Sequence, residues 1–208
     1  MTATSATASH ASKRSILPLV MILLVSLAPI VGALVVYFYP EWRPEGATNY
    51  GQFVEPQRPM PSGNALQLTT LDGKPFDLNS LKGEWLLLTS DVAQCDEPCA
   101  RKLFVLRNSH ASQGKNVERL TRVWLITDDG PVSEKVKQAY QGTIMLRARR
   151  DQLEPFLLDG TPHARQGLQG PMWIVDPNGN LILQYPAEAD PLGFRKDVSK
   201  LVYNSRIG

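Results

Sequence analysis

Residues 16–39 form an uncharged apolar run, ILPLVMILLVSLAPIVGALVVYFY, which constrains the chain more than any other stretch of its sequence. As an α-helix rising about 1.5 Å per residue this run is about 36 Å long, and the hydrocarbon core of a bilayer is about 30 Å thick. Tyr37, Tyr39 and Trp42 cluster at its end, as aromatic residues do at a membrane interface. We therefore predict a single transmembrane helix over residues 15–39, with the lipid bilayer as its partner.

Basic residues near this run predict how the chain is oriented. Lys13 and Arg14 precede the run, and no Asp or Glu occurs before it ends. By the positive-inside rule, residues 1–14 form a cytoplasmic tail and the chain after the run lies across the membrane. We expect a bacterial-type inner membrane with the C-terminal domain in the periplasm. Val31-Gly32-Ala33 also suits signal-peptide cleavage, and that alternative exports the same domain.

The net charge of +2 argues against one broad class of partner. The 208 residues hold 22 Lys and Arg against 20 Asp and Glu, and Lys13 and Arg14 account for the whole excess. The remainder of the chain is therefore neutral and gives no sign of the basic face that a nucleic-acid-binding domain needs. No nucleic-acid partner is expected.

Two further regions follow the apolar run. Residues 40–63 are rich in proline, which predicts a semi-rigid tether. From residue 64 to residue 208, apolar runs of strand length alternate with stretches of helical periodicity. We expect strands near residues 65–70, 75–78, 84–89, 122–127, 143–146, 172–175 and 181–185, and helices over 98–112, 133–141, 151–158 and 191–203.

The order of these elements predicts an α/β domain. Strands that alternate with helices imply parallel pairing through right-handed crossovers. Asp72-Gly73 and Pro177-Asn178-Gly179 are hairpin signals, which add antiparallel pairs. A mixed central sheet flanked by helices in this order is the thioredoxin-like arrangement, so residues 64–208 are predicted to form a thioredoxin-like fold.

The only two cysteines, Cys95 and Cys99, stand where a buried strand gives way to a helix. Unsatisfied N–H groups at a helix N-terminus stabilise an anion, and Pro98 suits the first helical turn. A separation of four residues puts both sulfurs on one side of that turn, where they can bond each other or share a soft metal ion. The pair is therefore the predicted site of redox or metal chemistry. The alternative is an inert disulfide, although so short a loop adds little stability.

Charged residues surround this pair. Asp96 and Glu97 disfavour a second negative charge on a nearby sulfur, and Arg101 and Lys102 partly offset them. We expect the reduced pair to carry a thiolate of moderate stability.

Three stretches resemble the Sco (SenC-like) family. They are residues 76–88 followed by the Cys-x-x-x-Cys pair, residues 124–129 (WLITDD) and residues 173–179 (WIVDPNG). The resemblance implies a membrane-anchored thioredoxin-fold protein that delivers copper to the CuA centre of cytochrome c oxidase, or reduces thiols there. It also implies that Cys95 and Cys99 bind Cu(I), and that a membrane respiratory oxidase subunit or another thiol protein is the partner.

The chain departs from this family at two positions. Leu168 stands where the resemblance places the histidine ligand of copper, and Ala100 stands where the family usually has proline. Two thiolates alone suit Cu(I), because thiolate is a soft ligand, so weaker copper retention or a purely thiol-based role is expected. His163 is a candidate third ligand if its loop approaches the cysteines. His110 is about 16 Å further along the predicted helix, too far to ligate.

Proline next to the late strand is a further candidate for the site. Thioredoxin-like reductases carry a cis-proline facing the cysteines, and the matching position falls at Gly170-Pro171. X–Pro bonds are cis in about 5% of cases in folded proteins, so a cis bond here is one interpretation of Pro171. The alternative is a proline at the start of a strand, with no role at the site.

Three functions follow from these residues. The first is a Sco-like assembly factor acting through Cu(I) delivery or through thiol reduction of the CuA site. The second is a general periplasmic thiol–disulfide oxidoreductase, TlpA-like, without copper. The third is a docking protein whose Cys95 and Cys99 form a resting disulfide. Cys-x-x-x-Cys spacing favours the first, and the absent histidine favours the others.

Overall fold

The computed structural model describes residues 16–39, 49–161 and 163–207, and divides the chain into two compact units, Met1–Ala47 and Thr48–Gly208. The predicted cytoplasmic tail, residues 1–14, and residues 40–48 of the predicted tether lie outside the described residues. In the first unit, α1 (Leu17–Phe38) is an exposed apolar helix of 22 residues. At about 1.5 Å per residue it is about 33 Å long, so this one helix is long and apolar enough to span a membrane.

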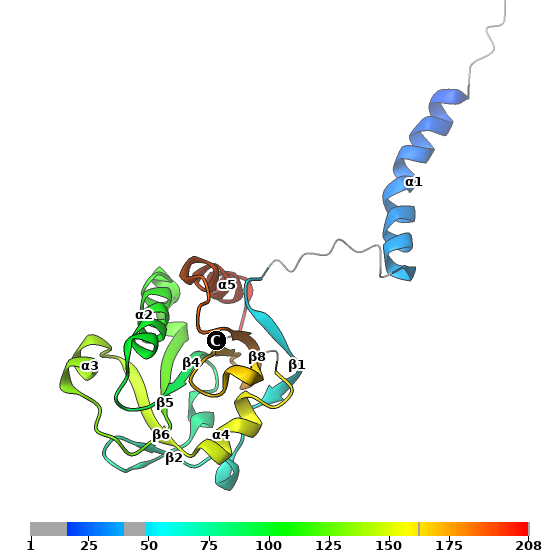
Figure 1. The fold of residues 1–208 in the computed structure, drawn as a ribbon. Coiled ribbons are helices and arrows are strands. Elements are labelled where there is room, and N and C mark those ends of the chain that lie inside the picture. Colours follow the sequence, from blue (N-terminus) through cyan, green and yellow to red (C-terminus); the bar gives the residue numbers. More distant parts are fainter. Residues whose placement is uncertain (1–15, 40–48, 162, 208) are drawn as a thin grey trace, which may run out of the picture. The chain divides into compact units, whose positions relative to one another are not determined.

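In the second unit, eight strands among the described residues form one mixed sheet (Figure 1), in the order β1-β8-β7-β4-β5-β6-β2-β3. Neighbours β4, β5 and β6 are parallel, whereas all other pairs are antiparallel. The strands are β1 (Gln52–Pro59), β2 (Leu68–Thr70), β3 (Pro75–Phe76), β4 (Trp85–Asp91), β5 (Leu120–Ile126), β6 (Thr143–Ala148), β7 (Met172–Val175) and β8 (Asn180–Tyr185).

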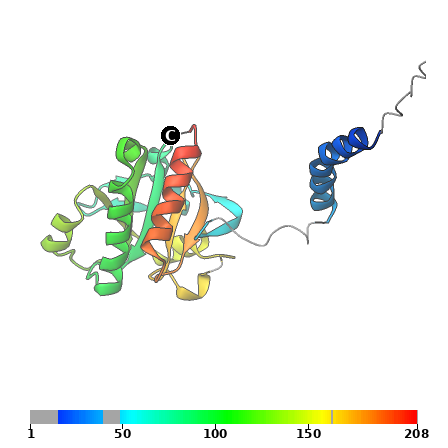
Figure 2. The same ribbon diagram turned by 90° about the horizontal axis from the view of Figure 1, so that it is seen from above.

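Helices cover both faces of the sheet. The α-helices of this unit are α2 (Glu97–Ala111), α3 (Glu134–Ala139), α4 (Arg150–Leu157) and α5 (Pro191–Asn204). Short 3₁₀ helices connect the other elements: η2 (Gly63–Ala65), η3 (Leu78–Leu81), η4 (Gly114–Arg119) and η5 (Ala164–Gln166). Figure 2 shows α2 and α5 side by side on one face. The predicted mixed sheet flanked by helices is confirmed.

The alternating direction of side chains along the central strands explains why packed clusters form on both faces of the sheet. Leu87 of β4 packs in a cluster with Leu106 of α2 and Val198 of α5, whereas its neighbours Leu86 and Leu88 pack in a second cluster. Successive side chains of a strand point to opposite faces, so β4 serves both layers and all seven of its residues are buried. Residues of α4 pack with the second cluster, and each buried cluster lies within the second unit.

The first strand differs from the sequence prediction. Residues 40–63 were predicted as a tether, but β1 occupies Gln52–Pro59 of that range and pairs antiparallel with β8. Its composition hides it, because it contains Pro56 and Pro59 and buries Val54 as its one fully covered side chain. Proline is tolerated at a sheet edge, and the register of β1 is irregular between Phe53 and Arg58, around Pro56. The domain therefore begins earlier than residue 64.

The carboxylate of Asp197 fixes the start of this strand. Its Oδ2 accepts hydrogen bonds from the N–H groups of Tyr50 (2.7 Å) and Gly51 (2.9 Å), and from the hydroxyl of Tyr185 (3.1 Å). A Cβ on Gly51 would lie 2.4 Å from the Tyr185 ring, so this close approach requires glycine. Asp197 thereby joins β1 to α5, which carries it.

His110 gives the domain a pH-dependent stability. It lies in the last turn of α2, and its Nε2 is 3.1 Å from the Leu120 carbonyl oxygen at the start of β5. Burial, with a smaller contribution from Arg122, lowers the pKa of His110 below its ordinary 6.5. The unfolded chain thus binds a proton at a higher pH than the folded domain, and stability falls as pH drops from about 7 through the folded-state pKa.

We predict that His110→Gln removes part of this acid loss, because Gln keeps a hydrogen-bond donor and does not titrate. The measurement is urea unfolding of residues 48–208, wild type and variant, at neutral and mildly acid pH. The free energy of unfolding of wild type should fall more between the two conditions than that of the variant. Equal losses of unfolding free energy in wild type and variant would show that folding does not lower the pKa of His110.

Candidate functional site

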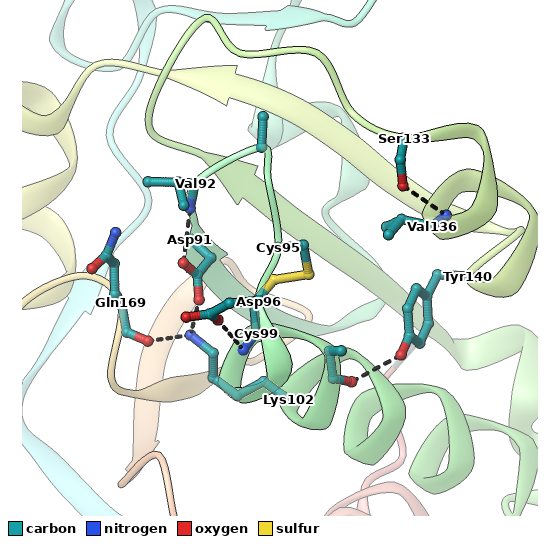
Figure 3. The surroundings of a disulfide bond; sticks show 12 residues. Asp91, Val92, Cys95, Asp96, Cys99, Lys102, Ser133, Val136, Tyr140 and Gln169 are labelled. Carbon is teal, nitrogen blue, oxygen red and sulfur yellow. Dashed lines mark hydrogen bonds and ion pairs between the residues drawn. A yellow bond between two sulfur atoms is a disulfide. The ribbon is translucent and has the colours of Figure 1, made fainter.

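A disulfide joins Cys95 and Cys99 at the junction between β4 and α2 (Figure 3), with Cα atoms 5.0 Å apart and an S–S distance of 2.02 Å. Cys95 lies in the connecting loop with φ of +44°, and its N–H donates to the Val92 carbonyl. Cys99 lies in the first turn of α2, which begins at Glu97. The predicted placement of both sulfurs at a strand-to-helix junction is confirmed.

The two sulfurs differ in their exposure. Cys99 is fully buried in a cluster with Leu103 of α2 and Trp124 of β5, whereas Cys95 packs at the edge of this cluster and is only half-buried. Helix geometry causes the difference, because position 99 faces the sheet and position 95 lies in the loop above it. Reagents from solvent can thus reach Cys95 more readily than Cys99.

The N-terminus of α2 carries a carboxylate of its own. Asp96 is the N-cap residue, and its Oδ1 accepts the N–H of Cys99 at 3.1 Å. From the sequence, the unsatisfied N–H groups at the start of this helix are expected to stabilise a thiolate. Asp96 takes one of these donors and adds a negative charge near the sulfurs, which disfavours a thiolate further. The Glu97 side chain is 90% exposed, and its carboxylate is 3.9 Å from the Arg101 guanidinium. So exposed an ion pair contributes little to stability.

Beneath this turn lies a buried cation. Lys102 is 1% exposed, and its Nζ is 2.9 Å from Oδ2 of Asp91 and donates at 2.9 Å to the carbonyl of Ser90. It also donates to the carbonyl of Gln169, in the segment before β7 (Figure 3). Burial lowers the pKa of Lys102, and the Asp91 carboxylate opposes this shift. One ammonium group therefore joins β4, α2 and the segment before β7.

From the sequence, Lys102 is expected to offset the charges of Asp96 and Glu97, and its burial is not predicted. Lysine is seldom fully buried unless it is paired, so composition gave no sign of it. Position was the available signal. Lys102 follows the buried Cys99 by three residues on one helix, and residues three apart share a face. Its partner Asp91 is the last residue of β4 and also accepts the Val92 N–H at 2.8 Å.

The segment before β7 does not supply a metal ligand. Leu168, where the resemblance to the Sco family predicts a histidine ligand, is 4% exposed and packs in the cluster that contains Leu86 and Trp173, not in the cluster of the cysteines. Its carbonyl accepts a hydrogen bond from Ser90 Oγ. Backbone carbonyls of this segment thus bind β4 and α2, while the Leu168 side chain fills the core.

Neither described histidine completes a copper site. The His163 N–H donates to Gln184 Oε1 at 2.9 Å, and its Nε2, which has no hydrogen-bond partner, is buried, which lowers the pKa of its ring. Within the described ranges, no three His, Cys, Asp or Glu residues are grouped so that they could hold a metal ion. In this structure His163 is therefore not grouped with Cys95 and Cys99. The donors present are two sulfurs, which suit Cu(I) after reduction and lack the third ligand.

The Gly170–Pro171 bond is trans, because the cis peptide bond found among the described residues is Glu55–Pro56. The cis alternative for Pro171 is therefore wrong, and the strand-start alternative is confirmed. Pro171 immediately precedes β7, where the first hydrogen-bonding residue is Met172. A proline just before a strand has no ladder hydrogen bond to lose, which accounts for this position without a role at the site.

Comparison with known proteins places the fold. A family model described as "Transmembrane-like, thioredoxin-like, C-terminal domain" matches residues 85–205, more than half of the chain. No curated protein sequence matches.

Three solved structures illustrate the shared fold. Copper-bound ScoI from Arabidopsis thaliana is 18% identical, with a TM-score of 0.53 over 67% of this chain and 96% of that chain. Apo Sco1 from Thermus thermophilus is 20% identical, with a TM-score of 0.52 over 75% of this chain and 99% of that chain. A thiol:disulfide interchange protein from Chlorobium tepidum is 18% identical, with a TM-score of 0.53 over 72% and 98%. At this identity the likeness shows the fold alone.

Breaking the buried ion pair should destabilise the site strongly. We predict that Lys102→Met lowers the free energy of unfolding by about 3–5 kcal/mol, because it leaves the Asp91 carboxylate buried without a partner. The double variant Lys102→Met/Asp91→Asn should recover part of this loss. Chemical denaturation of residues 48–208 measures both.

Lys137→Met is the matched control, because Lys137 pairs with Glu134 at 2.8 Å on the surface. Its cost should be less than about 1 kcal/mol. Equal costs for the two lysines, or no recovery in the double variant, would contradict a buried charge pair at Lys102.

Proposed function

The chain belongs to the transmembrane-like, thioredoxin-like C-terminal domain family, and from this premise we propose that it is a membrane-anchored thiol–disulfide oxidoreductase acting through Cys95 and Cys99. The observation that carries the proposal is the asymmetry of the disulfide, with Cys95 only partly buried and Cys99 fully buried beneath it. A partner sulfur reaches Cys95 first, and Cys99 is positioned to resolve the resulting bond from below.

The exchange proceeds in two steps that transfer two electrons to the partner. In the reduced protein the Cys95 thiolate attacks one sulfur of a partner disulfide, a mixed disulfide forms, and the partner's other sulfur leaves as a thiolate that takes up a proton. Cys99 then loses its proton and attacks Cys95 Sγ, which releases the second partner sulfur as a thiol. The products are a reduced partner and the Cys95–Cys99 disulfide described above.

Asp96 shapes this chemistry. Its carboxylate occupies a helix-terminal N–H group and disfavours a nearby thiolate. A less stable thiolate makes the dithiol easier to oxidise, because a dithiol whose reduced form is stabilised is the stronger oxidant. The site is therefore proposed to work as a reductant.

At a finer level we propose a Sco-like assembly role, in which the partner is the cysteine pair of the CuA site in a respiratory cytochrome c oxidase. The motifs around the cysteines and the candidate membrane helix α1 support this role. The donor set supports thiol reduction over copper delivery, because Leu168 replaces the third ligand and packs in the core. A general thiol–disulfide oxidoreductase remains the alternative and differs only in partner.

For location, we propose that α1 spans a bacterial inner membrane with the N-terminus in the cytoplasm and the domain in the periplasm. Lys13 and Arg14 before the helix support this orientation through the positive-inside rule. The disulfide supports it too, because exported compartments are oxidising and cytosolic disulfides are rare.

The order of the two cysteines can be tested by trapping. We predict that Cys99→Ser accumulates mixed disulfides through Cys95, whereas Cys95→Ser accumulates far fewer. With an aromatic disulfide reagent under native conditions, the single thiol of Cys99→Ser should react at least about tenfold faster than that of Cys95→Ser, because access controls the rate. Thiolate release measured by absorbance checks this.

Both variants should react equally once unfolded in denaturant, which controls for intrinsic reactivity. Equal rates in the folded proteins, or faster reaction of Cys99, would overturn the assigned roles.

Copper delivery can be tested separately. We predict that the reduced domain, residues 41–208, binds Cu(I) no more tightly than a peptide with the same Cys-x-x-x-Cys spacing, because two sulfurs are the whole donor set. Anaerobic titration against a competing chelator measures this, and Cys95→Ser should abolish binding. Affinity well above that of the peptide would favour copper delivery over thiol exchange.

A further inference from the structure

A groove runs along the exposed side of α5, away from the disulfide. Its volume is about 710 Å³, and it is bounded by Tyr50 at the start of the domain, by Gln113 after α2 and by Tyr203 of α5. Three cations line it, Arg195, Lys196 and Lys200, and the described residues of its wall include no carboxylate. This concentration of positive charge stands out in a domain whose overall charge is neutral.

The acidic residues of α5 do not cancel this charge. Asp197 is 2% exposed and faces inward, where it accepts the N–H groups of Tyr50 and Gly51. Asp190 is the N-cap residue and accepts the N–H groups of Leu192 and Gly193. The solvent face of the helix therefore presents basic and aromatic side chains.

Tyr50 is held in place beside these cations. Lys196 Nζ lies 5.5 Å from the centre of the Tyr50 ring and 3.3 Å from its hydroxyl. A Cβ on Gly193 would lie 2.4 Å from the same ring, so the ring sits directly against the backbone of α5. The aromatic wall of the groove is thus fixed by packing and by the hydrogen bonds of Asp197.

Chain length places a bilayer within reach of this groove. Tyr50 follows Phe38, the last residue of α1, by twelve residues, and a fully extended segment of that length spans at most about 40 Å. If α1 crosses a membrane, the groove is permanently close to lipid headgroups, which gives a high effective concentration.

We propose that this groove binds the phosphate of anionic phospholipid headgroups and holds the domain against the bilayer in which α1 is inserted. Each basic residue near an anionic surface strengthens association about fivefold, so Arg195 and Lys196 together strengthen it by about 25-fold. Tyr203 (81% exposed) and Leu192 (55% exposed) flank the cations on the same helix. Aromatic and apolar side chains beside cations are the composition of helices that lie in a membrane interface.

The groove shares no residue with the cluster that contains Cys99. Its Gln113 end is just beyond the C-terminal end of α2, whereas Cys99 is in the first turn of that 15-residue helix. A helix of this length separates Gln113 from Cys99 by about 20 Å. The inference therefore stands independently of the proposed thiol exchange, and it assigns the domain an orientation rather than a reaction.

The test uses the full-length chain in nanodiscs of phosphatidylcholine, with or without phosphatidylglycerol. A water-soluble acetylating reagent labels surface lysines, and mass spectrometry gives the rate at each site. We expect labelling of Lys196 and Lys200 to slow at least about threefold in the anionic discs at low salt. Lys74 and Lys135, exposed elsewhere on the domain, should keep their rates. High salt should remove the difference.

Three results would overturn the proposal. One is equal labelling of Lys196 and Lys200 in both kinds of disc. Another is equal slowing at all four lysines, which would reflect the bulk surface. The third is full protection by inorganic phosphate in neutral discs, which would make the groove a site for a free anion.

Matched variants complete the test. Arg195→Glu should return the labelling of Lys196 in anionic discs to its rate in neutral discs, because it reverses one charge of the groove. Lys135→Glu makes the same change in net charge on α3 and should leave the protection intact. Circular dichroism confirms that both variants fold, and persistence of protection in Arg195→Glu would contradict the proposal.

Discussion

The ammonium group of Lys102 is the interaction on which the arrangement of the site depends. It reaches from the first turns of α2 to the end of β4, through Ser90 and Asp91, and to the carbonyl of Gln169 before β7. Two of these segments, the end of β4 and the start of α2, flank the loop that carries Cys95. Burial of a charge is costly, and the Asp91 carboxylate with two carbonyls compensates for it. The loop that carries Cys95 is therefore held between a rigid strand end and a rigid helix start.

Both the exposure of Cys95 and the burial of Cys99 follow from that arrangement. β4 is covered on both faces and cannot move without disrupting two packed clusters, so its end is a fixed point. From this point a short loop turns into α2, whose inward face places Cys99 against Trp124. The sulfur of Cys95, on the loop that precedes α2, therefore lies above the start of the helix. An asymmetric pair of this kind suits sequential attack and resolution, which is why we favour thiol exchange over a passive disulfide.

Much of this could be predicted from the sequence, and the misses have physical causes. A continuous apolar run predicts a buried strand such as β4. Residues typical of a helix start predict the junction that carries the cysteines. By contrast β1 is an edge strand with two prolines and one fully buried apolar side chain, so its pattern resembles a linker. Lys102 was missed for another reason. Its burial depends on Asp91 and on the carbonyl of Gln169, and a partner 67 residues away leaves no trace in local periodicity.

The position of Leu168 shows why a resemblance at the cysteines does not carry the rest of a metal site with it. In this chain the segment before β7 is fixed by its main chain, with the carbonyls of Leu168 and Gln169 directed at Ser90 and Lys102. That orientation sends the side chain of residue 168 into the core beside Trp173. A histidine introduced there would meet apolar neighbours rather than the sulfurs. The direction of the side chain at position 168 is therefore a property of how the segment is held, and not of one side chain alone.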